Sequence, residues 1–118
     1  MIDQHWAEEF AREWIESWNS HCLVRIFSHY TDDFEMSSPL IFERMGEPSG
    51  TLKGKEKVSP YWQKGLAQMP KLHFEFEGVL IGAQSLTILY TNQKNQKVAE
   101  VLTFNQEGKA ISGNAHYS

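Results

Sequence analysis

The chain has 118 residues and a formal net charge of −4 at pH 7, a size that is ordinary for one folded domain. Its 11 lysine and arginine residues are scattered, whereas a nucleic-acid-binding domain usually presents a basic face. No apolar run approaches the roughly 18 residues that a membrane-spanning helix needs. We therefore expect one globular domain over residues 1–118, with neither nucleic acid nor a membrane as its partner.

Cysteine content and the charge at the start of the chain indicate a compartment. Cys22 is the only cysteine, which excludes an internal disulfide and fits a reducing cytoplasm. The first residues include Asp3, Glu8 and Glu9, the wrong charge for a secretory signal peptide. We expect a cytoplasmic protein in which Cys22 is a small buried residue at the start of a helix.

Hydrophobic periodicity predicts three helices. An aromatic residue recurs every four positions near the start, which indicates an amphipathic helix over about residues 3–19, capped by Asp3: Trp6, Phe10, Trp14 and Trp18. A shorter helix follows over about residues 23–30, and Thr31-Asp-Asp is expected to be the turn that ends it. The third helix covers about residues 55–69 and requires Pro60 in its first turn.

The remaining segments have the patterns of strands and turns. Alternating apolar residues predict a half-buried strand that ends at Pro39, with Phe34, Met36 and Ser38 on its inner face. Residues 43–49 are expected to form a polar loop, and Gly50-Thr-Leu-Lys-Gly a short strand. The last third has the pattern of four antiparallel strands with hairpin turns at 92–96 and 105–108. Helices followed by a strand meander indicate an α+β fold with the helices on one face of a curved sheet.

Four segments resemble conserved blocks of one superfamily: Trp14-Ile-Glu-Ser-Trp-Asn-Ser-His, Tyr30-Thr-Asp-Asp-Phe-Glu-Met-Ser-Ser-Pro, Gly50-Thr-Leu-Lys-Gly-Lys-Glu and Glu100-Val-Leu-Thr-Phe-Asn-Gln-Glu-Gly-Lys. They are similar to the SnoaL-like branch of the nuclear transport factor 2-like superfamily, and the similarity spans nearly the whole chain. It implies a cystatin-like cone with an apolar pocket between helices and sheet, and dimers formed through the outer sheet face. The superfamily includes isomerases, cyclases, hydrolases and non-catalytic binders, so the resemblance indicates a fold rather than an activity.

Ketosteroid isomerase, a relative with a known mechanism, uses an aspartate base with a tyrosine and a protonated aspartate as oxyanion donors. The resemblance puts its base at Ser38, its tyrosine near Trp14 and its protonated acid at Glu100. Ser38 cannot abstract a carbon-bound proton at neutral pH without a base of its own. We therefore do not expect ketosteroid isomerisation.

Glu100 is the sharpest candidate for a site residue. Strand alternation places it in phase with Val98, Leu102 and Phe104, which face the core. A carboxylate on an apolar face is unfavourable unless it is protonated, paired or hydrogen-bonded. Either Glu100 is a pocket acid with a raised pKa, or it forms a salt bridge at the sheet edge with Arg44 or a lysine. Ser38 is expected to offer a hydroxyl to the pocket or to bond the backbone.

Aromatic and aliphatic side chains that face inward are the candidates for ligand contact. Arg44, in the predicted loop, is a candidate contact for an anionic group or a partner in a surface salt bridge. Tyr117 is in phase with Gly113 and Ala115, whose small size leaves room for a cavity wall or for close strand packing. The full set of candidate substrate-binding residues is Trp14, Trp18, Phe34, Met36, Tyr61, Trp62, Leu102, Tyr117 and Arg44.

Other polar residues are not expected to form a site. Asp32 and Asp33 are expected to satisfy backbone groups in a turn. The five histidines show no metal-ligand spacing, so we expect no metal and no cofactor; His73 and His116 are expected on the outer sheet face.

Three functions remain open at the level of sequence. The first is a module that binds a small apolar ligand without turnover. The second is a cofactor-independent acid–base enzyme of isomerase, cyclase or hydrolase type, with Glu100 and Ser38 as its catalytic residues. The third is a structural dimer with a filled pocket. A moderately apolar outer face, formed by Thr87, Leu89, Ala99, Val101 and Thr103, predicts a homodimer.

Overall fold

Helix α1 (Gln4–Asn19) carries the aromatic stripe at the start of the chain. Asp3 is its N-cap, as predicted, because a side-chain oxygen of Asp3 accepts a hydrogen bond from the backbone N–H of Trp6 at 2.8 Å. Trp14 and Trp18 are buried, whereas Trp6 and Phe10 are half-buried and pack against Phe104. The short helix α2 (Leu23–Phe27) follows after a turn at His21. The computed structural model describes residues 2–118.

Six strands form one sheet in the order β2-β1-β6-β5-β4-β3. Only the β1–β6 pair is parallel, and the other neighbours are antiparallel. This arrangement confirms the predicted α+β class and the antiparallel meander of the last third. The strands are β1 (Tyr30–Ser37), β2 (Thr51–Lys53), β3 (Glu75–Gly82), β4 (Ser85–Thr91), β5 (Lys97–Phe104) and β6 (Ala110–Tyr117).

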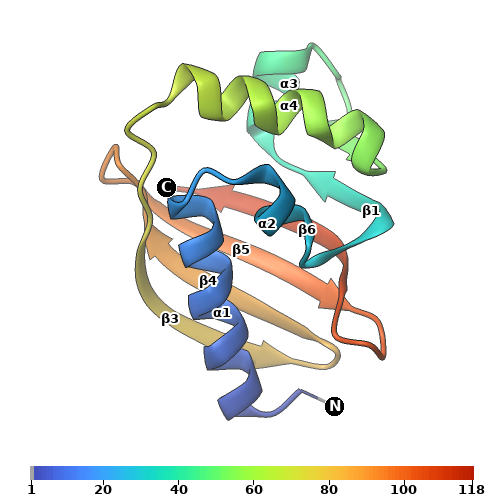
Figure 1. Ribbon diagram of the computed structural model, residues 1–118, viewed down its shortest axis with the longest axis vertical. Coiled ribbons are helices and arrows are strands. Elements are labelled where there is room, and N and C mark those ends of the chain that lie inside the picture. The colour runs from blue at the N-terminus through green and yellow to red at the C-terminus, as the bar shows by residue number, and fades with distance from the viewer. Residues whose placement is uncertain (1) are drawn as a thin grey trace.

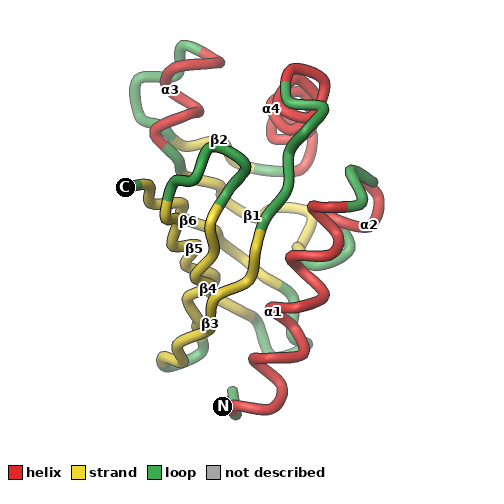
Figure 2. The backbone as a smooth tube through the Cα atoms, turned by 90° about the vertical axis from the view of Figure 1, so that its left-hand side faces the viewer, coloured by secondary structure: helices red, strands yellow, loops and turns green. Residues whose placement is uncertain are grey.

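The helices α1, α2 and α4 (Lys55–Gln68) lie on one side of the sheet, as Figure 2 shows edge-on. Helix α1 crosses in front of β3, β4 and β5, while α4 lies beyond the end of the sheet, beside α3 (Pro39–Met45) (Figure 1). The apolar residues of β4, β5 and β6 that face the helices are buried, and their neighbours on the outer face stay half-exposed or exposed. The core therefore occupies the space between the helices and the inner sheet face.

Strand β1 begins earlier than the sequence pattern predicts. Tyr30 pairs with Ala110 of β6, and a register shift follows between Tyr30 and Glu35. The Thr31-Asp-Asp segment is therefore part of a strand rather than a turn, because pairing with β6 overrides the local preference of aspartate for turns. Asp32 and Asp33 are exposed, and Asp32 lies 3.2 Å from the Lys55 ammonium.

The predicted polar loop over residues 43–49 is partly wrong. Residues 39–45 form α3, which begins with proline in its first turn and ends at Gly46 with a left-handed φ of 68°. Ser38 is its N-cap, and its hydroxyl accepts a hydrogen bond from the Leu40 N–H at 3.1 Å. Ser38 thus lies just past β1, and Arg44 lies in the last turn of a helix.

Two local predictions are wrong. Pro60 is the sixth residue of α4 and not part of its first turn. It is exposed, and the helix tolerates the loss of one hydrogen bond there. Cys22 is exposed rather than buried, because it lies at the cap of α2 outside the packed face.

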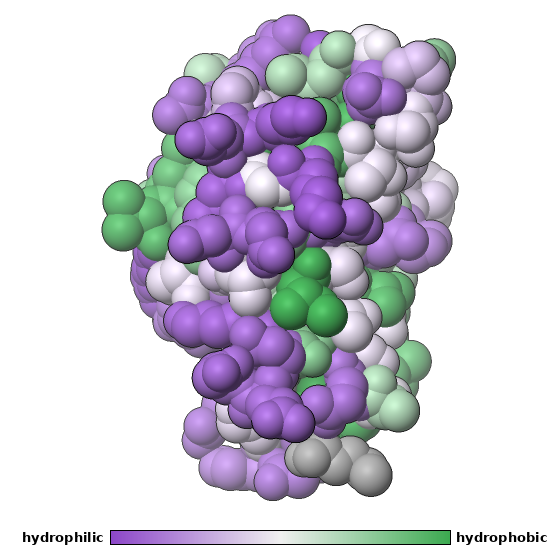
Figure 3. Space-filling view, turned by 90° about the vertical axis from the view of Figure 1, so that its right-hand side faces the viewer, coloured by the Kyte–Doolittle hydropathy of each residue, from purple (hydrophilic) through white to green (hydrophobic). Residues whose placement is uncertain are grey.

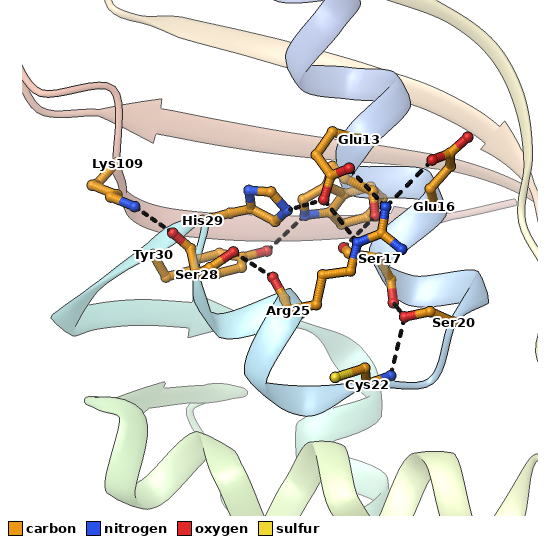
Figure 4. A network of polar contacts seen from close by, with 11 residues as sticks. Glu13, Glu16, Ser17, Ser20, Cys22, Arg25, Ser28, His29, Tyr30 and Lys109 are labelled. Atoms are coloured by element: carbon orange, nitrogen blue, oxygen red, sulfur yellow. Dashed lines mark hydrogen bonds and ion pairs between the residues drawn. The ribbon is translucent and has the colours of Figure 1, made fainter.

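A polar network joins α1 to the segment between α2 and β1 (Figure 4). The Arg25 guanidinium donates to both oxygens of Glu13, at 2.7 and 3.0 Å, and His29 Nε2 lies 3.4 Å from the same carboxylate. These contacts lower the pKa of Glu13, mainly through the hydrogen bond from Arg25. Burial lowers the pKa of His29 against the opposing attraction of Glu13. The network fixes the chain where β1 enters the sheet.

Charged and polar residues cover most of the side of the molecule in Figure 3, where hydrophobic residues appear only in small separate groups. None of the helices in residues 2–118 is both long enough and apolar enough to cross a bilayer.

Candidate functional site

A cavity of about 320 Å³ lies between the helices and the inner face of the sheet. Helices α1, α3 and α4 contribute to its wall, together with β1, β4, β5, β6 and the β4–β5 hairpin. This size and mixed lining are typical of a site for one small organic molecule.

Glu100 lies in the part of the cavity wall that the sheet forms. It is 3% exposed, and its neighbours across β5 are Ile88 and Ala115. Burial raises its pKa to about 8, because the ionised carboxylate loses its hydration, and one hydrogen bond from Tyr90 opposes that rise only in part. The Tyr90 hydroxyl donates to Glu100 Oε1 at 3.3 Å. Glu100 is therefore mostly a neutral acid at pH 7, and it forms no salt bridge within residues 2–118.

Two further phenols, Tyr61 and Tyr117, line the cavity. Burial raises the pKa of both, and the nearby Glu100 carboxylate raises it further. The Ser38 hydroxyl and the Arg44 guanidinium act on both phenols in the opposite direction. Both phenols remain protonated at neutral pH, so their O–H groups are available as hydrogen-bond donors.

Aromatic rings form much of the apolar wall. Trp18 meets Trp62 edge to face, with ring centroids 5.0 Å apart. Phe74 stacks on Trp14 at 6.1 Å and lies 4.3 Å from Tyr90. The indole N–H of Trp14 donates to the Tyr30 hydroxyl at 2.9 Å, so Trp14 offers its ring rather than a donor to the cavity. Such flat, rigid surfaces suit a flat apolar ligand.

Residues from three segments meet at another part of the cavity wall. Arg44 of α3 donates from Nη2 to the Met69 sulfur at 3.5 Å, and Gln93 of the β4–β5 hairpin donates to the same sulfur at 3.4 Å. Lys94 and Glu43, both exposed, also line the cavity. We call Arg44, Met69, Gln93, Lys94 and Glu43 the polar rim.

The structure brings most of the candidate site residues together. The ones that line the cavity are Trp14, Trp18, Met36, Arg44, Tyr61, Trp62, Glu100 and Tyr117. Phe34 and Leu102 are fully buried beneath the wall and do not line it. Ser38 is buried and is not part of the lining; its hydroxyl caps α3 and also acts on the phenols of Tyr61 and Tyr117, which do line the cavity.

Gly113 of β6 allows close packing beside the cavity. A Cβ there would lie 3.1 Å from both Met36 and Leu102 and 3.8 Å from Glu100 Oε2.

Sequence reasoning did not assign some lining residues to the site. Tyr90 is hydrogen-bonded to Glu100. Its alternation with Leu86 and Ile88 in β4 could have placed it on the inner sheet face. Of the polar rim, sequence reasoning assigned Arg44 but not the others; Met69, Gln93 and Lys94 had a weaker signal, because they follow breaks in periodicity that resemble ordinary turns. Among residues 2–118, no three histidine, cysteine, aspartate or glutamate side chains lie together as metal ligands would.

The chain is similar to several known proteins. Residues 11–113 match the model of the SnoaL-like domain family. The structure matches a SnoaL-like protein of unknown function from Burkholderia thailandensis with a TM-score of 0.96 and 46% identity, covering 99% of this chain and 98% of that one. No curated protein matches the chain.

Two more distant structures share the fold. A nuclear transport factor 2-like protein of unknown function from Burkholderia pseudomallei has a TM-score of 0.74 and 16% identity, covering 95% of this chain and 90% of that one. TerC, co-crystallised with polyporic acid, has a TM-score of 0.77 and 12% identity, covering 95% and 91%. The family match over most of the sequence and the near-complete overlap with a relative 46% identical establish that the chain belongs to the SnoaL-like domain family.

Proposed function

We propose that the cavity binds a small, flat, largely apolar molecule that presents a carbonyl or hydroxyl oxygen to Glu100. The observation that carries this proposal is a buried carboxylic acid, with a pKa of about 8, in the wall of a 320 Å³ cavity that is otherwise rich in aromatic rings. Protein interiors are close-packed, so a cavity of this size that side chains leave unfilled is unusual.

The protonated form of Glu100 gives the binding its chemistry. A neutral carboxylic acid is a strong hydrogen-bond donor, whereas the carboxylate only accepts. The phenols of Tyr61 and Tyr117 line the same cavity and offer further O–H donors to a ligand. Binding to such an oxygen therefore favours the acid form and weakens when Glu100 ionises.

The solved structures support a ligand site without naming its ligand. TerC, which shares the fold at 12% identity, was co-crystallised with polyporic acid. The same proposal includes a homodimer formed through the outer sheet face, and a cytoplasmic location that suits the free, exposed Cys22.

A catalytic role is the second candidate, and the pKa of Glu100 favours it. An acid with a pKa of about 8 exists in both protonation states near neutral pH, as a general acid or base requires. The reaction would be a cofactor-independent isomerisation, cyclisation or hydrolysis in which Glu100 moves a proton to or from the bound molecule. Glu100 carries this proposal; Ser38 lies outside the cavity lining, but its hydroxyl acts on the phenols of Tyr61 and Tyr117 and stays a candidate beside Glu100. The third candidate, a purely structural dimer, is less favoured because the cavity is not filled.

Fluorenone, a flat aromatic ketone, tests the proposal. Three tryptophans line the cavity, so quenching of their fluorescence reports binding. We expect wild type to bind fluorenone, with an affinity that is constant below pH 7 and falls about tenfold per pH unit above the pKa of Glu100. Glu100→Gln keeps an N–H donor and is expected to remove the pH dependence. Glu100→Leu removes the donor and is expected to weaken binding at every pH.

Glu107→Gln is the matched control, since it removes a carboxylate from an exposed hairpin far from the cavity lining. It should leave both affinity and pH dependence unchanged. If wild type shows no binding, the ligand-binding proposal is wrong for this chemical class. If fluorenone binds equally to wild type and Glu100→Leu, Glu100 does not contact the ligand oxygen.

A further inference from the structure

We infer that the ligand of this cavity carries an anionic group, such as a carboxylate, which Arg44 binds at the polar rim while the ligand's apolar body extends toward Glu100. The inference rests on the proposed function and specifies its ligand class: an aromatic or polycyclic acid rather than a neutral ketone. Four observations on Arg44 and its surroundings carry it.

The first observation is that Arg44 lies against the cavity without an acidic partner. Its guanidinium lines the cavity and donates to the Met69 sulfur, a weak acceptor. It forms no ion pair with any carboxylate among residues 2–118. A position in the last turn of α3 accounts for a positive charge there, but not for a side chain that turns inward.

The second observation is a glycine that makes room for this side chain. Gly65 is buried within α4, where glycine is less favourable than alanine. A Cβ at Gly65 would lie 3.1 Å from Arg44 Nη1, which is closer than an unstrained contact. The Arg44 guanidinium therefore lies close against α4 at Gly65.

The third observation is that the charge of Arg44 acts on the inside of the cavity. Its guanidinium lowers the pKa of Tyr61 and Tyr117, in opposition to the larger effect of burial. Both phenols line the cavity, so the positive charge of Arg44 lies close enough to act on groups of the cavity wall.

The fourth observation is the balance of charge at the rim. Lys94 from the β4–β5 hairpin adds a second cation to Arg44, and Glu43 is the only carboxylate besides Glu100 among the described lining residues. Since Glu100 is mostly neutral at pH 7, the lining has a net charge of about +1. An arginine fork binds a carboxylate with two parallel hydrogen bonds, which makes a carboxylate the best-suited group.

The isomeric fluorenone carboxylic acids and their methyl esters, compared at about pH 6, test the inference, because each acid is then ionised and Glu100 is protonated. Several isomers are needed because the distance between the ketone oxygen and the carboxylate differs among them. That distance decides which acid can contact Glu100 and Arg44 at the same time. We expect at least one acid to bind wild type about tenfold or more tighter than its ester. Raising the salt concentration should reduce that preference.

Variants at the rim assign the preference to residues. Arg44→Gln is expected to abolish the acid-over-ester preference, because it weakens binding of the acid much more than binding of the ester. Gly65→Ala should shift the guanidinium and reduce the preference without lowering the midpoint of thermal unfolding, which separates positioning from loss of fold. Lys57→Gln removes one exposed positive charge outside the cavity lining and should change neither affinity.

Each other outcome overturns a specific statement. If the esters bind but no acid binds more tightly than its ester, the anionic-ligand inference is wrong and the proposed function stands. If a preference exists and survives in Arg44→Gln, the assignment to Arg44 is wrong. If neither acids nor esters nor fluorenone itself bind wild type, the proposed function fails and this inference fails with it.

Discussion

At the scale of single residues, Glu100 couples the stability of the protein to pH. Its folded-state pKa of about 8 lies above the value of 4.5 for an unperturbed glutamate, so the folded state binds the proton more tightly than the unfolded state. The contribution of this group to stability is complete below pH 4.5 and is lost as pH rises toward 8. Each pH unit in that window lowers the free energy of unfolding by about 1.4 kcal/mol.

Glu100→Gln should therefore unfold at higher urea concentration than wild type at pH 8, with a difference that shrinks as the pH falls toward 5. Urea titrations of both proteins at several pH values measure this difference, and other titrating groups cancel in the comparison. A difference that stays constant with pH would show that Glu100 is ionised and solvated in the folded state.

Another residue-scale prediction concerns the buried bond from Trp14 to Tyr30. Tyr30→Phe removes the acceptor and leaves a buried indole N–H without a partner, which should lower the free energy of unfolding by about 1–3 kcal/mol. Trp14→Phe in the same background removes the unsatisfied donor, so the effects of the two changes should not add. Urea unfolding of both single variants and the double variant measures this coupling. Additive effects would mean that the bond contributes little.

At the scale of elements, Ser38 has a structural role as the N-cap of α3, and this role can be tested separately from a catalytic one. As N-cap, Ser38 satisfies the Leu40 N–H, so Ser38→Ala should lower the free energy of unfolding by about 1 kcal/mol. Ser38→Gly should cost only a few tenths of a kcal/mol, because glycine is itself an acceptable cap. Thermal or urea unfolding measures both. Equal stability of wild type and Ser38→Ala would show that the Ser38 hydroxyl does not stabilise α3 as a cap.

The elements also show which parts of the fold the sequence can predict. Strong periodicity predicts α1, α4 and the strands β4 to β6 within a few residues, because their apolar faces are continuous. The predicted start of β1 was wrong because β1 pairs with β6, a segment some 80 residues away in the chain. A local turn preference cannot reveal such a pairing. Helix α3 was missed because its seven residues, which begin with a proline and are followed by a glycine, give too short a pattern to distinguish from a loop.

The candidate site follows the same division. Glu100 and the aromatic residues of α1 and α4 were predictable because their phase within an element fixes the face they occupy. Phe34 and Leu102 share that inner face but are buried beneath the cavity wall. The alternation of a strand predicts which face a side chain occupies, but not whether that side chain reaches the cavity. The contact between Arg44 and Gly65 depends on how α3 meets α4, and no periodicity within either helix encodes it.

At the scale of the whole molecule, the outer sheet face predicts association. Thr87 and Leu89 of β4 and Ala99, Val101 and Thr103 of β5 stay only half-buried in the single chain. Val101 pairs with Thr87 on one side and Asn114 on the other, which places it near the middle of this face. A moderately apolar surface at the middle of a sheet is typical of an interface between copies of one chain.

We expect sedimentation of wild type at micromolar concentration to give the mass of a dimer. Val101→Glu would bury two like charges across a symmetric interface, so this variant should sediment as a folded monomer with an unchanged cavity. Val24→Glu is the matched control, because Val24 is 81% exposed on α2, away from the sheet, and its change should leave the dimer intact. A wild type that sediments only as a monomer would refute the interface. Dissociation by Val24→Glu but not by Val101→Glu would instead place the contact on the helical side of the molecule.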